Sequence, residues 1–261
     1  MRLAVVSDIH GNLPALEAVR ADIASADVDM VVNLGDIVSG PLWPVETADL
    51  LMQLGWPTVR GNHERQVLRP LAGMGASDRH AAERLHERHR AWLAGLPATW
   101  RSDDGQVLAC HGTPASDLQY FLETVTPDFG QHGSRGVRPA TEAEARERAG
   151  DTEAAVILCG HTHTPRALQL DDGRLVVNPG SVGLPAYDDA HPHVHYVETG
   201  TPHARYALIE RVGSSWSVQL RAVAYDWEAA ARQAERHGRG DWADALRSGR
   251  VGRLESEAVR A

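Results

Sequence analysis

Short apolar runs alternate with longer amphipathic segments along the first sixty residues. Three runs predict buried strands, at 3–7, 30–34 and 57–60. Between them, apolar residues recur at helical spacing and predict helices at 13–25 and 44–54. This order of strand, helix, strand, helix and strand predicts right-handed crossovers and a parallel sheet.

The remainder of the chain is richer in turn signals than the first part. Dipeptides and short runs typical of tight turns predict three hairpins, at Asp104-Gly105, Asp172-Gly173 and Gly213-Ser214-Ser215. The other predicted elements are a single charged helix at 78–93, a helix capped by Thr141 and Glu144, a buried strand at 154–159, and two short helices after Trp227. Two segments, 115–140 and 184–205, show little periodicity and are expected to be loops.

A polar cluster follows each of five apolar runs. The clusters are Asp8-Ile9-His10, Gly35-Asp36, Gly61-Asn62-His63, His111-Gly112 and Gly160-His161-Thr162-His163. Because ligand sites of open α/β sheets form at strand ends, convergence of these ends would gather carboxylates, an amide and imidazoles. Such ligands suit divalent transition metals, and the set is too rich for one ion with about four to six ligands. The clusters therefore predict a two-metal site, which is the usual apparatus for cleaving phosphate esters.

The order and spacing of these clusters resemble the calcineurin-like metallophosphoesterase superfamily, whose pattern runs D-x-H, G-D, G-N-H-[DE], H and G-H-x-H. The resemblance extends from residue 1 to about 183 and ends in Asn178-Pro179-Gly180-Ser181-Val182-Gly183, which is similar to the small bacterial phosphodiesterase branch. It implies an α/β fold in which two packed mixed β-sheets are flanked by helices, a four-layer αββα sandwich. The strand and helix pattern agrees with this architecture.

The resemblance also implies the role of each polar side chain. One metal would be held by Asp8, His10 and His163 and the other by Asn62, His111 and His161, with Asp36 bridging both. A metal-bridging hydroxide would be the nucleophile, and His63, next to a ligand, would be the catalytic general acid. Manganese is the first choice for both ions, while Fe, Zn, Co and Ni remain alternatives because the same nitrogen and oxygen ligands accept them.

We expect a metal-dependent phosphoric ester hydrolase that acts on small substrates, with phosphodiesterase activity as the first choice. The alternatives within the enzyme class are asymmetric cleavage of a dinucleoside polyphosphate, and phosphomonoesterase or protein phosphatase activity. The alternative outside it is a protein-binding scaffold, similar to the retromer scaffold subunit. Ligand residues decay in such scaffolds, whereas this chain keeps all of them.

Substrate contacts beyond the metals are predicted at residues beside the motifs and in the two loops. The candidates are Arg60, Arg65, Arg166, His191, His193 and His195. The three loop histidines alternate, so an extended segment would place them on one face, at a rim that contacts substrate or a partner subunit; the alternative is a solvated loop. Specificity is expected in the loops 115–140 and 184–205, because loops on a fixed scaffold usually carry it.

Composition narrows the class of partner. With 261 residues, of which 43% are hydrophobic, the chain is expected to form one domain, 1–261, with a helical tail at 227–261. The net charge of −9 disfavours long nucleic acids, while a small phosphorylated substrate such as a nucleotide stays compatible because bound metals attract it.

The chain lacks an 18-residue apolar run, and Asp8 comes too early for a signal peptide, so a cytoplasmic protein without membrane contact is expected. Homo-oligomers are compatible with these features. Cys110 and Cys159 are expected as thiols, or as a disulfide if their strands are neighbours.

Overall fold

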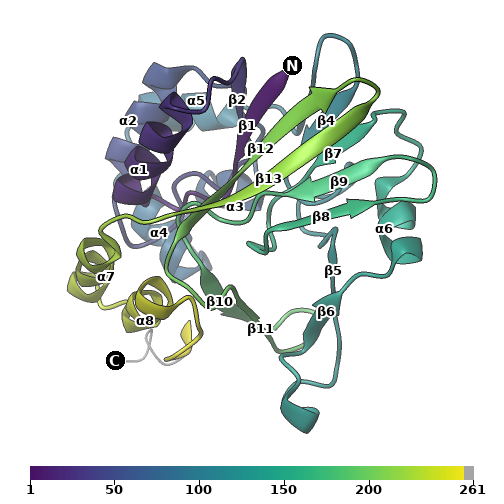
Figure 1. Cartoon of the computed structure of the whole chain (residues 1–261). Coiled ribbons are helices and arrows are strands. Elements are labelled where there is room, and N and C mark those ends of the chain that lie inside the picture. The colour runs from purple at the N-terminus through teal and green to yellow at the C-terminus, as the bar shows by residue number, and fades with distance from the viewer. Residues whose placement is uncertain (256–261) are drawn as a thin grey trace.

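The computed structural model describes residues 1–255, and its centre is a pair of mixed β-sheets packed face to face (Figure 1). The first sheet has the strand order β13 (Ser215–Val223), β12 (Ala204–Val212), β1 (Arg2–Val6) and β2 (Met30–Asn33). The second has the order β3 (Thr99–Arg101), β4 (Val107–Cys110), β7 (Val156–Leu158), β9 (Leu175–Asn178) and β8 (Arg166–Gln169). The pairs β1-β2, β4-β7 and β7-β9 are parallel, and the other pairs are antiparallel.

Alternate side chains of each strand enter different layers of the core. Along β1, Leu3 and Val5 point between the two sheets and belong to one apolar cluster with residues of β4, β7 and β9. Ala4 and Val6 face the opposite way and pack with the apolar residues of helix α1 (Leu13–Ala24). A strand buried on both faces therefore reads as a continuous apolar run rather than an alternating one.

Helices cover the outer face of each sheet. Helices α1 and α2 (Pro44–Leu54) share an apolar cluster with the first sheet, and α3 (Asn62–Val67), α4 (Ala76–Ala82) and α5 (Glu87–Ala94) extend this layer. On the other side, α6 (Glu142–Ala149) packs its alanines against β4 and β7. The predicted four-layer αββα sandwich is confirmed. Cys110 and Cys159 lie in this last cluster as free, buried thiols.

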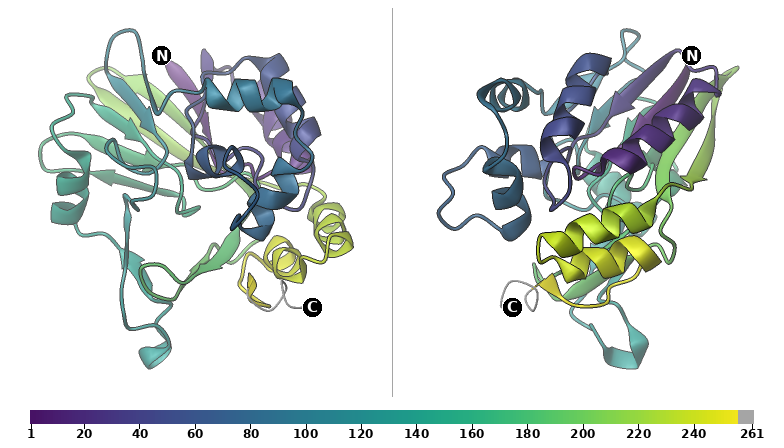
Figure 2. Two further views of the ribbon diagram at one scale, coloured as in Figure 1. Left: turned by 180° about the vertical axis from the view of Figure 1, so that it is seen from behind. Right: turned by 90° about the vertical axis from the view of Figure 1, so that its left-hand side faces the viewer.

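Several local predictions hold because the turn and cap residues have the chemistry that the backbone needs. The three predicted hairpins form β3-β4, β8-β9 and β12-β13. The N–H of Thr141 donates to the Glu144 carboxylate at 2.7 Å, which completes the predicted cap of α6. The predicted C-terminal pair is α7 (Trp227–Arg236) and α8 (Gly240–Ser248), which pack side by side (Figure 2); residues 256–261 of the predicted tail lie outside the described residues.

Other local predictions are wrong. The single helix at 78–93 is two helices, α4 and α5, because His86 has an extended backbone and its N–H donates to the Nδ1 atom of His89. The strand at 57–60 is reduced to one bridge between Thr58 and Asn33, since Arg60 donates its N–H to the Pro97 carbonyl. Helix α3 was not anticipated. Among the described residues, no helix is both long and apolar enough to cross a bilayer.

The two segments expected to be loops each contain a hairpin. Residues 115–140 hold β5 (Glu123–Val125), a 3₁₀ turn η1 (Gln131–Gly133) and β6 (Val137–Pro139), and residues 184–205 hold β10 (Ala186–Asp189) and β11 (His195–Glu198). The Arg135 carbonyl accepts a hydrogen bond from the N–H of Tyr196, and its guanidinium lies 2.8 Å from the Glu198 carboxylate. We refer to the joined segments, at the bottom of Figure 1, as the hairpin unit.

Gly183 packs closely against the loop that follows β1, and its N–H donates to the Asp8 carbonyl at 3.0 Å. A Cβ on Gly183 would lie 1.8 Å from the carbonyl oxygen of Ile9, so any side chain forces the backbone apart. We expect Gly183→Ala to lower the free energy of unfolding by about 3 kcal/mol in urea denaturation. The matched control is Gly95→Ala, where a Cβ would lie at an ordinary contact distance of 3.5 Å and φ is −83°, and which should change stability by less than about 0.5 kcal/mol. Equal effects of both variants would contradict this packing.

Candidate metal centre

The five polar clusters converge at one end of the two sheets. Asp8 and His10 follow β1, Asp36 follows β2, His111 follows β4, and His161 and His163 follow β7, while Asn62 begins α3. Backbone hydrogen bonds tie these strand ends together. The N–H of Asp8 donates to the Gly35 carbonyl at 2.9 Å, that of His10 to the Asp36 carbonyl at 3.0 Å, and that of Gly160 to the His111 carbonyl at 2.6 Å. These hydrogen bonds join the ends of β1 and β2 in the first sheet and the ends of β4 and β7 in the second.

One group of candidate ligands consists of Asp8, His10 and His163, all buried, each of which offers a ligand atom within 4.8 Å of the others. The Nε2 atoms of His10 and His163 are 3.2 Å apart, and His163 Nε2 is 3.4 Å from Asp8 Oδ1. The Oδ1 atom of Asp8 is buried without a hydrogen-bond partner. A buried carboxylate oxygen without a partner is costly. A cation between these atoms would satisfy it, so the residues fit a metal ion.

The second group consists of Asp36, His111 and His161, with Asn62 beside them. His111 Nε2 lies 3.0 Å from Asp36 Oδ2 and 3.1 Å from Asn62 Oδ1. It also lies 3.9 Å from Asp8 Oδ1, so the two groups are adjacent. The donor set of carboxylate, amide oxygen and imidazole fits a divalent transition metal. All seven predicted ligands are thus brought together, in the two sets that the resemblance implies.

Each candidate histidine has one ring nitrogen committed to a backbone carbonyl, which can only accept a hydrogen bond. The Nδ1 atoms of His10, His111 and His163 donate to the carbonyls of Ser39, Leu34 and Leu184 at 2.7, 2.8 and 2.7 Å. In His161 it is Nε2 that donates, to the Leu118 carbonyl at 3.2 Å. When such a ring is neutral, its other nitrogen carries a lone pair that can bind a metal ion. This arrangement is typical of metal-ligating histidines.

The backbone at the centre is strained. Asp8, His10, Asp36, His161 and His163 have φ between 53° and 67°, in the left-handed region that residues other than glycine rarely occupy. Each such residue costs about 1 kcal/mol or more, and such strain concentrates at functional sites. Five of the seven candidate ligands share this conformation. The strain is therefore associated with aiming side chains at the centre.

The charges at the centre favour a bound cation. Burial opposes ionisation of Asp8, but the neighbouring His163 outweighs it and lowers the pKa of Asp8 to about 2, and His111 similarly holds the pKa of Asp36 well below its usual value. Burial lowers the pKa of His10 to about 3 and of His161 to about 4, so both stay neutral. Burial also opposes protonation of His111, yet Asp36 outweighs it and raises the pKa of His111 to about 10. The centre therefore attracts positive charge strongly.

Glu64 holds two of the ligand loops together, a role that the sequence prediction did not assign. Its carboxylate is fully buried and accepts hydrogen bonds from the N–H groups of Asp36 at 2.8 Å, Ile37 at 2.8 Å and Gly61 at 2.7 Å. The loop after β2 and the start of α3 thus share one anchor. The signal in the sequence is position: an acidic residue three places after Gly61, where a helix begins.

His63 lies at the edge of the centre. Its Nε2 is 4.0 Å from Asp36 Oδ2, and its Nδ1 is 2.7 Å from the carboxylate of Asp78 in α4. Burial opposes protonation, but Asp36 and the bond to Asp78 outweigh it and raise the pKa of His63 to about 9. The ring is therefore oriented and able to carry a proton. Sequence reasoning missed Asp78, because nothing local marks a residue that is distant in sequence and on another helix.

The hairpin unit contributes two tyrosines beside the ligands. The ring of Tyr120 packs edge-on against His161 at 5.1 Å, and that of Tyr187 against His163 at 4.7 Å. Their hydroxyls are 2.7 Å apart, and the Tyr120 hydroxyl is 2.9 Å from His195 Nε2. The two rings thus form one wall of the centre, and His195 at the start of β11 holds the Tyr120 hydroxyl.

The remaining predicted substrate contacts are dispersed. The guanidinium of Arg65 pairs with Asp117 at 2.8 Å, that of Arg166 pairs with Glu123 at 3.0 Å, and the Arg60 side chain is exposed. The expectation of one face for the loop histidines is wrong: β11 begins at His195, which is buried, while His191 and His193 lie in the preceding exposed turn. Contact of any of these residues with substrate stays a prediction.

Comparison with known proteins agrees with this geometry. The fold is shared with the crystal structure of a metallophosphoesterase from Sphaerobacter thermophilus, with a TM-score of 0.71 and 24% identity over 94% of this chain and 100% of that one. It is also shared with a hypothetical protein from Pyrococcus horikoshii, with a TM-score of 0.74 and 18% identity over 96% and 99% of the two chains. An uncharacterized protein of Methanocaldococcus jannaschii is 23% identical over 92% of this chain and 94% of its own length.

The family comparison concerns the part of the chain that carries the ligands. Residues 1–201, which contain all five polar clusters, match the model of the calcineurin-like phosphoesterase superfamily domain. The matched region also contains β5, β6, β10 and β11 of the hairpin unit, whereas β12, β13, α7 and α8 follow it. The chain therefore belongs to the calcineurin-like phosphoesterase superfamily, a group of metal-dependent hydrolases.

Proposed function

We propose that the protein is a phosphodiesterase with a dinuclear centre, in which manganese is the preferred ion. The observation that carries this proposal is the pair of adjacent ligand groups whose histidine lone pairs and buried carboxylates face one another. Asp8, His10 and His163 would hold one ion, and Asn62, His111 and His161 the other, with Asp36 between them. Two divalent ions in such a site offset phosphate charge and activate a water molecule as nucleophile.

A side chain of the protein would then protonate the leaving oxygen. His63 stands beside Asp36, and Asp78 fixes the orientation of its ring, so its Nε2 can give a proton to the departing alkoxide. Strain at the ligand residues and the anchoring by Glu64 hold the site in one geometry. The wall of Tyr120 and Tyr187 limits access from the side of the hairpin unit.

The charges around the centre support a diester rather than a monoester or a polyphosphate. A phosphodiester carries one negative charge at neutral pH, whereas the alternatives carry two or more. Arg65 and Arg166 are each paired with a carboxylate, so neither cation is free to offset additional charge. The net charge of −9 also repels highly anionic substrates.

Metal binding can be measured without turnover. Titration calorimetry with Mn²⁺ should show two ions per wild-type chain, one ion for Asp8→Asn and weaker binding at both sites for Asp36→Asn, because in the proposed centre Asp8 would hold one ion whereas Asp36 would contact both. Asp172→Asn, which alters an exposed turn carboxylate paired with Arg174, is the matched control and should bind two ions. A single ion per wild-type chain would rule out the dinuclear centre.

The role of His63 is tested by separating binding from catalysis. We expect His63→Ala to keep two Mn²⁺ ions and to lower kcat on a methyl phenyl phosphodiester, whose leaving group needs a proton, by about 10²-fold, since general acid assistance contributes roughly 10²- to 10⁴-fold. His86→Ala, at an exposed histidine, should match the wild type. Loss of an ion from His63→Ala would make His63 a ligand instead. Faster hydrolysis of a phosphomonoester or dinucleoside polyphosphate than of any diester would replace the proposed substrate class.

A further inference from the structure

Helix α8 reaches the metal centre from outside the region that defines the family. Trp242 of α8 is buried, and its ring packs edge-on against the ring of His10 at 5.8 Å. It also lies against the backbone of Gly40, where a Cβ would be 2.7 Å from the indole. The neighbouring Ser39 carbonyl is the acceptor that orients His10. The C-terminal helices thus support a candidate ligand directly.

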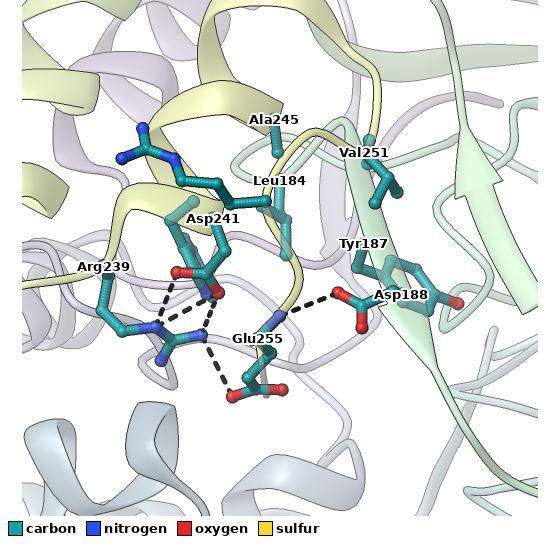
Figure 3. Close-up of a pocket in the computed structure, with 11 residues that line it drawn as sticks. Leu184, Tyr187, Asp188, Arg239, Asp241, Ala245, Val251 and Glu255 are labelled. Atoms are coloured by element: carbon teal, nitrogen blue, oxygen red, sulfur yellow. Dashed lines mark hydrogen bonds and ion pairs between the residues drawn. The ribbon is translucent and has the colours of Figure 1, made fainter. Parts of the chain in front are cut away.

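Arg239, which precedes α8, is a buried cation with every side of its guanidinium engaged. Its Nε and Nη2 atoms donate to the Asp241 carboxylate at 3.0 and 2.6 Å, and Nη2 also donates to Glu255 at 3.0 Å (Figure 3). Its CZ atom lies 5.7 Å from the centre of the Trp242 ring. Two carboxylates and an aromatic ring therefore hold the guanidinium in one orientation.

The remaining nitrogen of Arg239 is directed at α4. Its Nη1 donates to the hydroxyl of Ser77 at 2.8 Å, and the Ser77 carbonyl accepts a hydrogen bond from the N–H of Gly40. Ser77 directly precedes Asp78, whose carboxylate is 2.7 Å from His63 Nδ1. A short chain of contacts therefore runs from Arg239 through Ser77 and Asp78 to His63.

We propose that Arg239 is a positioning residue for His63. By holding the first turn of α4, it keeps Asp78 where it orients the imidazole toward the leaving oxygen. Burying an arginine with two carboxylates is a weak source of stability, because desolvation offsets most of the attraction, but it is a good source of fixed geometry. The inference rests on the proposed function, since it assigns Arg239 a share in the general acid step.

The effect of a misplaced general acid depends on the leaving group. A p-nitrophenolate departs with little help from a proton, whereas an unsubstituted phenolate or an alkoxide needs one. Loss of positioning should therefore steepen the dependence of kcat on the pKa of the leaving alcohol. A general loss of stability or of metal would instead lower all rates by a similar factor.

The test uses the full-length, Mn²⁺-loaded protein and a series of methyl aryl phosphodiesters. We expect Arg239→Ala to lower kcat by about 10-fold or more for the phenyl ester and by less than about 3-fold for the p-nitrophenyl ester, which is part of the full contribution of a general acid. Ser77→Ala removes only the hydrogen bond between Arg239 and α4. It should lower kcat more for the phenyl ester than for the p-nitrophenyl ester, but by a smaller factor than Arg239→Ala. This second variant keeps the test valid if Arg239→Ala folds poorly.

A double variant distinguishes action through His63 from an independent effect. If Arg239 acts through His63, then His63→Ala combined with Arg239→Ala should be no slower than His63→Ala alone, within about 2-fold. The matched control is Arg247→Ala, which removes another arginine bridging two carboxylates in the same helix pair, Glu228 and Glu235, without contact to α4. It should leave the leaving-group dependence unchanged.

Two outcomes overturn the inference while leaving the proposed function intact. One is a uniform loss of rate across the ester series in Arg239→Ala and Ser77→Ala, with His63→Ala still steepening the dependence. The other is an additive loss in the double variant. Failure of the wild-type protein to hydrolyse any diester is a different result, because it rejects the proposed function itself.

Discussion

Two buried carboxylates and four imidazoles face one another at the end of the sheets, and the rest of the site is arranged around their mutual charge. Asp8 and Asp36 stay ionised although both are buried, because His163 and His111 lower their pKa values. Removing an ion from water costs several kcal/mol unless an opposite charge compensates. His10 and His161 stay neutral and compensate poorly, whereas Asp36 raises the pKa of His111 to about 10, which shows how strongly the site favours positive charge. Bound metal ions would supply that charge.

The strained ligand backbone persists because its surroundings determine it. Five residues in the left-handed region would relax if their loops were free, but the N–H of Asp8 and of His10 are held by the neighbouring strand end, and Glu64 clamps two loops through three N–H groups. The sheets supply the rigid frame, and the loops carry the strain. Because the sheets are rigid, short motifs can place candidate ligands accurately without long supporting segments.

The parts of the structure that could be predicted are those that local chemistry determines. Candidate ligands other than Asn62 were predictable because they follow a buried strand within a few residues, and hairpins were predictable because Asp-Gly and Gly-Ser turns permit only a few backbone forms. The break between α4 and α5 could not be predicted, because it depends on a hydrogen bond between His86 and His89. The sequence around these two residues is like that of an ordinary helix. The contacts of Asp78 and Arg239 could not be predicted for a related reason. Their roles depend on partners far along the chain, and a polar residue on an amphipathic helix has no local mark of burial.

The pairing of β1 with β12 has a consequence for the order in which this molecule is made. Arg2 to Val5 lie opposite residues 207–210, so β1 is synthesised about 200 residues before one of its two neighbouring strands. At typical synthesis rates of about 5–20 residues per second, β1 waits on the order of ten seconds or more for that neighbour. Asp8 and His10, at its tip, spend most of this interval without His163, which is translated about 150 residues later. The full set of candidate ligands is thus present only after most of these residues have been made, rather than after synthesis of any one motif.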